Sequence, residues 1–167
     1  KAMVELLLSR GADVNAHGGG GYTALHQAAL LGFKTLAEVL IANKADVAAR
    51  ADDENYQATP LQAAADKGHS ELLECLLRHG ADPNSVSSKG WTALMEAVGN
   101  GHILSVQALL AAKADVNAQN QDGRTALSYA AGQGHADCVK ALLAAKADPN
   151  AGKLDLPLAQ AAWNRHL

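Results

Sequence analysis

Hydrophobic residues in the middle of the chain fall into two helical patterns separated by a glycine. In the first pattern, Leu61, Ala64 and Ala65 are spaced as i, i+3 and i+4, which places them on one face of a helix. Thr59 precedes this pattern, and its hydroxyl can cap the free N–H groups of the first turn while Pro60 occupies the first helical position. The sequence therefore predicts a short helix that begins after Thr59.

A second helical pattern follows from Ser70. Its apolar residues share one face and are Leu72, Leu73, Leu76 and Leu77. Gly80 is placed to end this helix, because glycine readily adopts the left-handed conformation that closes many helices. The next segment, "ADPNS", contains a proline and an asparagine, which favour a turn over a helix. We expect a helix–turn–helix unit followed by an extended finger.

Both patterns recur along the chain. Thr23, Thr92 and Thr125 stand where Thr59 stands, and a degraded copy begins at Leu156. The spacing is 33 residues from Thr59 to Thr92 and again to Thr125, but 36 residues from Thr23 to Thr59, so three residues are inserted once. A catalytic site would occur once, whereas a structural unit recurs. The polar residues of "TPLQAAADKGH" are therefore capping, turn and surface residues.

The repeats divide the single domain 1–167 into six units. We expect a partial repeat at 1–17, whole repeats at 18–50, 51–86, 87–119 and 120–152, and a partial repeat at 153–167. The insertion falls in 51–86. One helix pair cannot bury its apolar face alone, so the units must stack into a solenoid. Because the chain begins inside a second helix and stops inside a first one, we expect a fragment of a longer array.

Composition limits the partners. Hydrophobic residues make up 49% of the chain but aromatic residues only 4%, so Ala, Leu and Val must build the core. The net charge is −3, and acidic and basic residues are interspersed along the chain. The sequence shows no signal peptide and no apolar run of about 18 residues. Cys75 and Cys138 lie in different repeats, too far apart for a disulfide. We expect an intracellular monomer with reduced thiols that neither binds nucleic acid nor inserts into membranes.

The repeated phrases resemble the ankyrin repeat. The family's Thr-Pro-Leu-His-x-Ala-Ala, its Gly-His pair and its closing Gly-Ala-Asp-x-Asn recur along almost the whole chain. The resemblance implies an all-α solenoid of stacked helix–turn–helix units with extended, β-hairpin-like fingers. Among the first phrases, only the one that begins at Thr23 keeps the family's histidine, as His26. Lys44, Lys113 and Lys146 replace the closing glycine and, in its left-handed conformation, would each cost about 1 kcal/mol.

Two irregular segments could bind a ligand in principle. "HGGGGY", His17 to Tyr22, resembles a phosphate-binding loop but lacks the Lys-Ser/Thr that follows in such loops. "RADDENYQ", Arg50 to Gln57, carries three acidic residues but lacks the alternating ligands, central glycine and terminal glutamate of a calcium loop. We interpret both as fingertips, the second lengthened by the insertion, and expect no cofactor.

Four histidines recur at one position of the repeat: His69, His102, His135 and His166. Each lies a whole repeat from the next, which is too far for the ligands of one metal ion. The ankyrin resemblance implies instead that each imidazole packs and forms hydrogen bonds between neighbouring repeats. No nucleophile, base and orienting acid converge anywhere, so we predict neither a metal site nor a catalytic site.

Recognition is the function that remains. Solenoids bind along extended concave surfaces, here formed by the fingers and the first helices. Residues next to the capping threonine and just ahead of the Gly-His pair should point to this surface. The candidates are Tyr22, Leu30, Leu31, Asn55, Tyr56, Asp66, Lys67, Lys89, Trp91, Asn100, Asp122, Arg124 and Gln133. We expect Trp91 to anchor a partner, supported by Tyr22, Tyr56 and Arg124; alternatively, Trp91 packs on the neighbouring finger near Tyr56.

The leading hypothesis is a module that binds a protein or peptide. The alternatives are a structural spacer or membrane-tethering array, and a substrate-recruiting segment of a larger enzyme or ubiquitin-ligase-type complex. In eukaryotic ankyrin proteins the finger asparagine can be hydroxylated. The matching residues are Asn15, Asn84, Asn117 and Asn150, whereas Ala48 departs from the pattern.

Overall fold

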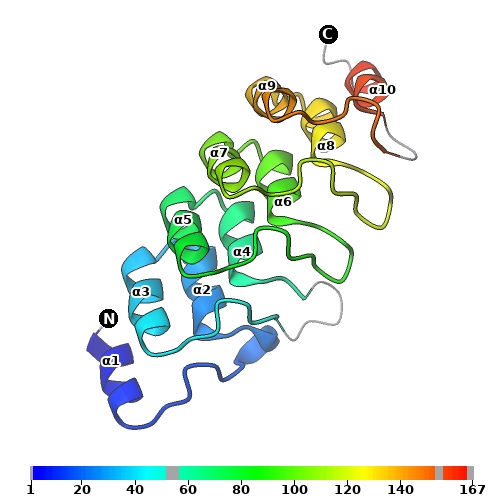
Figure 1. Cartoon of the computed structure of the whole chain (residues 1–167). Coiled ribbons are helices and arrows are strands. Elements are labelled where there is room, and N and C mark those ends of the chain that lie inside the picture. The colour runs from blue at the N-terminus through cyan, green and yellow to red at the C-terminus, as the bar shows by residue number, and fades with distance from the viewer. Residues whose placement is uncertain (1, 52–56, 153–155, 165–167) are drawn as a thin grey trace.

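The computed structural model describes residues 2–51, 57–152 and 156–164, which form a row of stacked helix pairs (Figure 1). The first helices of the units are α2 (Ala24–Leu31), α4 (Pro60–Asp66), α6 (Ala93–Gly99), α8 (Ala126–Gln133) and α10 (Pro157–Trp163). The second helices are α1 (Ala2–Ser9), α3 (Lys34–Ala42), α5 (Ser70–Arg78), α7 (Ile103–Ala111) and α9 (Ala136–Ala144). A single 3-10 turn, η1 (Gly19–Gly21), precedes α2. The predicted all-α solenoid is confirmed.

The threonine of each whole unit caps its first helix as predicted. The hydroxyl oxygens of Thr23, Thr59, Thr92 and Thr125 each accept a hydrogen bond from the backbone N–H three residues later. At α4, the N–H of Gln62 donates to Thr59 Oγ1 at 3.3 Å, and Gln62 Oε1 accepts the N–H of Thr59 at 2.8 Å. These reciprocal bonds satisfy N–H groups that a helix start leaves free, and so they set where the first helices begin.

The core lies between the two rows of helices and continues from unit to unit. First helices contact first helices from α2 to α10, and second helices contact second helices from α3 to α9. The predicted leucines Leu72, Leu73 and Leu76 are buried, while Leu77 is only half-buried against the core. Alanines fill much of the remaining interior, which lets thin helices approach closely. None of the helices described is long and apolar enough to cross a bilayer.

Both cysteines lie in this core. Cys75 and Cys138 are buried and free, and burial raises the pKa of both thiols. A raised pKa lowers the fraction of reactive thiolate. The two residues therefore act as small core side chains, as the sequence predicted.

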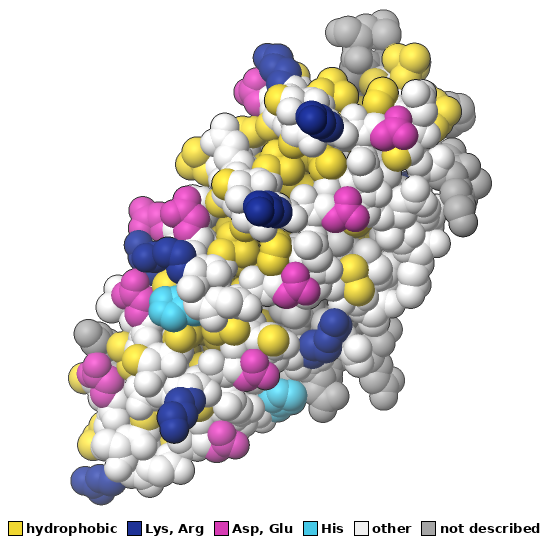
Figure 2. Space-filling model, viewed as in Figure 1, with side chains coloured by type: hydrophobic (Ala, Val, Ile, Leu, Met, Phe, Trp, Pro, Cys, Tyr) yellow, Lys and Arg dark blue, Asp and Glu magenta, His cyan; other side chains and the backbone are white. Residues whose placement is uncertain are grey.

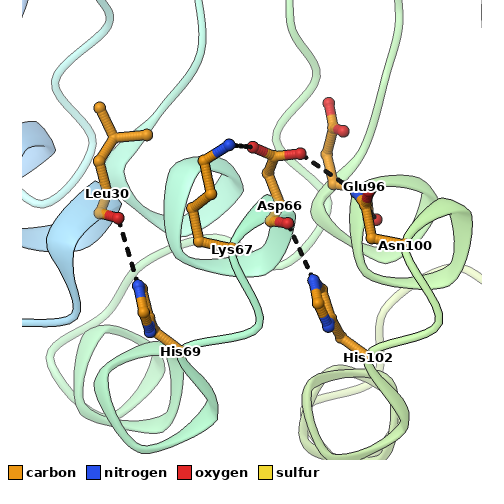
Figure 3. A network of polar contacts seen from close by, with 7 residues as sticks. All are labelled: Leu30, Asp66, Lys67, His69, Glu96, Asn100 and His102. Carbon is orange, nitrogen blue, oxygen red and sulfur yellow. Dashed lines mark hydrogen bonds and ion pairs between the residues drawn. The ribbon is translucent and has the colours of Figure 1, made fainter.

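The repeated histidines join neighbouring units. His69 Nε2 lies 3.2 Å from the Leu30 carbonyl oxygen, and His102 Nε2 lies 3.0 Å from that of Asp66 (Figure 3). A carbonyl only accepts, so each Nε2 donates. His135 makes the same contact with Gly99 at 3.3 Å. The predicted role is confirmed for these three histidines, and His166 lies outside the described residues.

Glycine in the turn of the preceding unit makes room for each ring. A Cβ atom on Gly68 would lie 2.6 Å from His102 Nδ1, and one on Gly32 would lie 2.7 Å from the His69 ring. Both glycines also have a positive φ, which side chains resist. The Gly-His pair is thus one packing device: the glycine of one unit receives the histidine of the next.

The three lysines that replace the closing glycine adopt its left-handed conformation. Lys44, Lys113 and Lys146 have φ of 67°, 62° and 66°, where Gly11 and Gly80 have 87° and 90°. The condition under which the sequence implied a cost at these lysines is met. The repeat geometry therefore overrides the local preference of lysine at three places, at about 1 kcal/mol each.

Neighbouring fingers are also tied together. Antiparallel bridges pair Val86 with Thr92 and Gln119 with Thr125, which confirms hairpin-like geometry in these two fingers. Three finger asparagines reach the next finger: Asn15, Asn84 and Asn117 each accept a hydrogen bond through Oδ1 from the backbone N–H of an aspartate 31 residues later, at 2.7–2.8 Å. Ala48 interrupts this ladder, because it has no side-chain acceptor.

Replacing Ala48 with asparagine is expected to stabilise the protein by about 1 kcal/mol, because it would complete the ladder toward Asp82. The local backbone already suits asparagine: the N–H of Ala48 donates to Asp46 Oδ1 at 2.9 Å, as that of Asn84 does to Asp82. Urea unfolding measures the change. Asn84→Ala, which removes an existing link to Asp115, should cost a similar amount. If Asn84→Ala is costly and Ala48→Asn gains nothing, the ladder does not extend across this junction.

Candidate functional site

We call the side of the stack that carries the fingers and the first helices the inner surface. Three rows of side chains cross it from unit to unit. The residues before the capping threonines are Tyr22, Ala58, Trp91 and Arg124. The second row lies four positions after the capping threonines and consists of Gln27, Ala63, Glu96 and Tyr129. The third row is the last turn of each first helix and includes Leu30, Leu31, Asp66, Lys67, Asn100 and Gln133.

The aromatic part of this surface centres on Trp91. Its ring lies 4.6 Å from that of Tyr129, centroid to centroid, with a tilt of 41°. The guanidinium carbon of Arg124 lies 5.8 Å from the Tyr129 centroid, and the Tyr129 hydroxyl accepts a hydrogen bond from Asn120 at 3.0 Å. Burial raises the pKa of the Tyr129 hydroxyl. Trp91, Arg124 and Tyr129 therefore form one half-buried group, which we call the aromatic cluster.

The structure bears on the alternative kept open for Trp91, that it packs on the neighbouring finger near Tyr56 and is not available to a partner. The residue is half-buried and packs against the core. Its aromatic partner is Tyr129 of the next unit, and Tyr56, the other partner considered, lies outside the described residues together with Asn55. Trp91 accordingly contributes to folding as well as presenting one part of its ring to solvent.

A hollow of about 340 Å³ opens on the inner surface where the unit 51–86 meets its neighbours. It exists because this unit carries Ala58 and Ala63 in the first two rows, where adjacent units carry Tyr22, Trp91 and Glu96. Its lining consists of Tyr22, Leu30, Ala58, Gln62, Ala63, Asp66, Lys67 and Glu96. Four of the predicted binding residues thus share one depression.

Polar groups at the rim of the hollow are linked to one another (Figure 3). Lys67 Nζ lies 2.9 Å from Asp66 Oδ2, and this contact raises the pKa of the lysine through the hydrogen bond and the opposite charge. Asn100 Nδ2 donates to Asp66 Oδ1 at 3.1 Å. Asp66, Lys67 and Asn100, all predicted binding residues, therefore form a connected rim.

Glu96 is the residue that sequence reasoning missed. Its side chain is only 8% exposed, although it lines the hollow. Its Oε1 atom is buried and has no hydrogen-bond partner among the described residues, and burial raises the pKa of the carboxyl group to about 7. Figure 3 shows the carboxyl group on the same side of the helices as the Asp66 and Lys67 side chains. The signal that could have identified Glu96 is the variation of the second row, whose side chains differ in type between units as strongly as those of the first row.

The remaining candidates are more scattered. Gln133 is exposed and, with Arg124 and Tyr129, borders a smaller hollow of about 120 Å³. Leu31 is 58% exposed at the end of α2. Lys89 and Asp122 are exposed on fingers and join neither hollow. The structure therefore gathers most described candidates into two places, the 340 Å³ hollow and the aromatic cluster.

The remaining surface offers little sign of metal or charge-driven binding. Within the described ranges, no group of three or more His, Cys, Asp or Glu side chains could hold a metal ion. The glycine segment at 18–21 contains the short turn η1, and most of the acidic segment Arg50–Gln57 lies outside the described residues. On the face shown in Figure 2, basic and acidic side chains are interspersed with hydrophobic ones, and neither sign dominates among the described residues.

Comparison with known proteins settles the family. A family model described as "Ankyrin repeats (3 copies)" matches residues 1–87, 45–120 and 64–153, which together cover most of the chain. The chain belongs to the ankyrin repeat family. Ankyrin repeats are generally non-enzymatic modules that mediate protein–protein interactions, and the helix pairs, fingers and Gly-His contacts described above agree with this assignment.

Several characterised ankyrin repeat proteins are similar to this chain. Human ankyrin repeat and SOCS box protein 6 is 37% identical over 105 residues, covering 56% of this chain and 24% of that protein. Human BCL-6 corepressor-like protein 1 is 34% identical over 82 residues, covering 49% and 4%. The Drosophila melanogaster ankyrin repeat and KH domain-containing protein mask is 39% identical over 88 residues, covering 53% and 2%. The matches thus span a quarter or less of each relative's length.

Proposed function

We propose that this ankyrin repeat chain binds a protein or peptide segment along its inner surface. The observation that carries the proposal is the aromatic cluster, where Trp91, Tyr129 and Arg124 lie together and remain half-exposed. Tryptophan, tyrosine and arginine contribute most to interface energies once a partner covers them. The hollow beside Tyr22, Asp66 and Lys67 extends the same surface toward the N-terminal units.

The chemistry of the inner surface argues against a purely structural spacer. A spacer needs only the contacts that hold the stack together, and the capping threonines and buried leucines that supply them recur in each whole unit. The inner rows instead change from aromatic to small to charged side chains. We further propose that the chain acts as a monomer inside cells and does not bind nucleic acid, consistent with its net charge of −3.

Recruitment into a larger protein is the second candidate function. It is favoured by the relatives, which are much longer than this chain and whose names join ankyrin repeats to a SOCS box or a KH domain. The inner surface would then select the protein that the rest of the polypeptide acts on.

The proposed binding surface is tested with Trp91→Ala. Affinity capture with the chain as bait identifies partners, and calorimetry with a purified partner then gives the affinity. The substitution is expected to weaken binding by about 2 kcal/mol or more, because it removes the largest side chain of the aromatic cluster. It should also lower the melting temperature, because the ring packs on Tyr129. Binding is therefore measured well below the melting transition.

Leu104→Ala is the matched control. Leu104 is a large apolar residue that is 64% exposed on α7, in the row of second helices away from the inner surface. It should leave the affinity unchanged. Equal affinities for the protein with Trp91→Ala and the unsubstituted protein would remove the aromatic cluster from the interface, and a loss with Leu104→Ala alone would move the interface to the second helices.

A further inference from the structure

The hollow of the inner surface is lined by a carboxyl group, that of Glu96, with one oxygen that has no hydrogen-bond partner among the described residues. Glu96 is more than nine-tenths buried and lines the hollow, and its Oε1 atom is buried and forms no hydrogen bond with a described residue. A buried polar group without a partner costs free energy, and a buried carboxylate costs more. Such a group is uncommon in a folded protein and points to a ligand that supplies the missing donor.

The polar side chains that line the hollow beside Glu96 direct the hydrogen bonds recorded for them to other acceptors. Gln62 Nε2 donates to the Trp91 carbonyl at 2.6 Å, and Gln62 Oε1 accepts from Thr59. Lys67 is paired with Asp66 at 2.9 Å. Among the described residues no donor is directed at Glu96 Oε1, so a bound ligand has an acceptor to use there.

We propose that the hollow receives an arginine side chain of the bound protein segment, with its guanidinium on the Glu96 carboxylate. This inference rests on the proposed protein-binding function and specifies one residue of the partner. The apolar lining of Leu30, Ala58 and Ala63 suits the methylene stem, which covers apolar surface readily. Two acidic side chains, Glu96 and Asp66, and one basic side chain, Lys67, line the hollow, so its charge is net negative when both carboxyl groups are ionised and complements an arginine.

Arginine fits this site better than lysine. A guanidinium is less strongly hydrated than an ammonium and offers five N–H donors in a plane, so it can bind a buried carboxylate and reach a second acceptor. Asp66 is that second acceptor at the rim: its oxygens already face Lys67 and Asn100, and a carboxylate can accept several hydrogen bonds. Lysine would offer a single, more strongly hydrated charge.

Binding should also release a proton. The Glu96 carboxyl is held partly protonated near neutral pH by burial, whereas a bound guanidinium favours the ionised form. Affinity should therefore rise with pH through neutrality. The other titratable or charged groups on elements packed against α6 are Asp66 and Lys67 of α4, His102 before α7, and Arg124 and Tyr129 at α8.

The test uses a pair of short probes: an acetylated, amidated Gly-Ser peptide with one central arginine, and the same peptide with citrulline, which keeps the shape without the charge. Two-dimensional NMR of the whole chain follows both titrations. We expect the arginine peptide to shift the amide signals of Glu96, Ala63 and Asp66, with affinity at least about tenfold above that of citrulline. Its affinity should be higher at about pH 8 than at about pH 6.

Glu96→Gln should abolish both the preference for arginine and the pH dependence, since it removes the charge and the titrating group while keeping the side-chain shape. Any pH dependence left in this variant belongs to the other groups named above. Glu74→Gln, at an exposed position of α5, removes an equal charge outside the hollow and should change neither property. A lysine peptide that matches the arginine peptide would show a general cation site and overturn the choice of arginine.

The inference is overturned if arginine and citrulline peptides bind alike, if neither shifts these signals, or if Glu96→Gln leaves arginine binding intact. None of these outcomes bears on whether a protein partner uses the aromatic cluster, because the probes carry no such partner. Conversely, a partner that depends on Trp91 but not on Glu96 would support the proposed function and reject the arginine site.

Discussion

Replacing Leu109 with alanine is expected to lower the free energy of unfolding by about 2–5 kcal/mol. Leu109 is completely buried on α7, where it packs within the continuous core. The substitution removes apolar contacts and leaves a cavity, and close packing on every side prevents the surroundings from collapsing into it. Leu76→Ala on α5 is expected to behave in the same way, since Leu76 is equally buried. Urea unfolding followed by circular dichroism measures the loss.

The same helix provides the control for this prediction. Leu104, which is 64% exposed on α7, undergoes the identical change of side chain in Leu104→Ala without opening a cavity. Its free energy of unfolding should change by less than about 0.5 kcal/mol. A loss below about 1 kcal/mol for Leu109→Ala would mean that α7 turns a different face to the core than the one described.

Glu96→Gln is expected to stabilise the protein by about 2–3 kcal/mol at about pH 8. The cause is the cost of ionising a buried carboxyl group, which raises its pKa from the ordinary 4.5 to about 7. Between these two values the folded protein holds a proton that the unfolded chain has released. Stability is therefore highest below about pH 4.5 as far as this group is concerned, and it falls as the pH rises toward 7.

Urea unfolding across this pH range tests the prediction. The parent protein should lose stability between about pH 4.5 and pH 7, and Glu96→Gln should remove most of that slope. Glu74→Gln, at an exposed position, is the matched control and should leave the slope in place. Identical slopes with and without Glu96 would show that its carboxyl group is solvated in the folded protein. A variant that gains stability while losing arginine binding would show that the carboxyl group is retained for recognition.

The local features of the fold could be predicted from the sequence because short-range chemistry determines them. A threonine with its hydroxyl at a helix start, a glycine at a turn and leucines at helical spacing act within a few residues of one another. Their recurrence at 33 residues then defines the unit. For the same reason the predicted cap at Thr59, the turn at Gly68 and the buried face with Leu72, Leu73 and Leu76 are confirmed.

The resemblance to the ankyrin repeat predicted contacts between units that no local sequence pattern could show. The packing of His69 and His102 on the preceding unit came from the ankyrin resemblance, and the structure supplies its geometry. The same resemblance identified Lys44, Lys113 and Lys146 as replacements of the closing glycine, and the structure shows that all three adopt its left-handed conformation. A repeated sequence therefore predicts contacts between units as well as local structure, because each unit packs against the next one in the same way.

The proposed binding surface could not be predicted in full from the sequence, because its properties arise from differences between neighbouring units in the tertiary structure. The sequence by itself determined the solenoid, its caps and turns, and the first and third rows of the inner surface, but not the second row, which contains Glu96. Only the tertiary structure shows that the Trp91 ring packs against Tyr129 and that Ala58 and Ala63 leave a hollow bordered by Glu96. Burial of a carboxyl group is a property of everything packed around it, and residues some 30 positions away in the chain determine it.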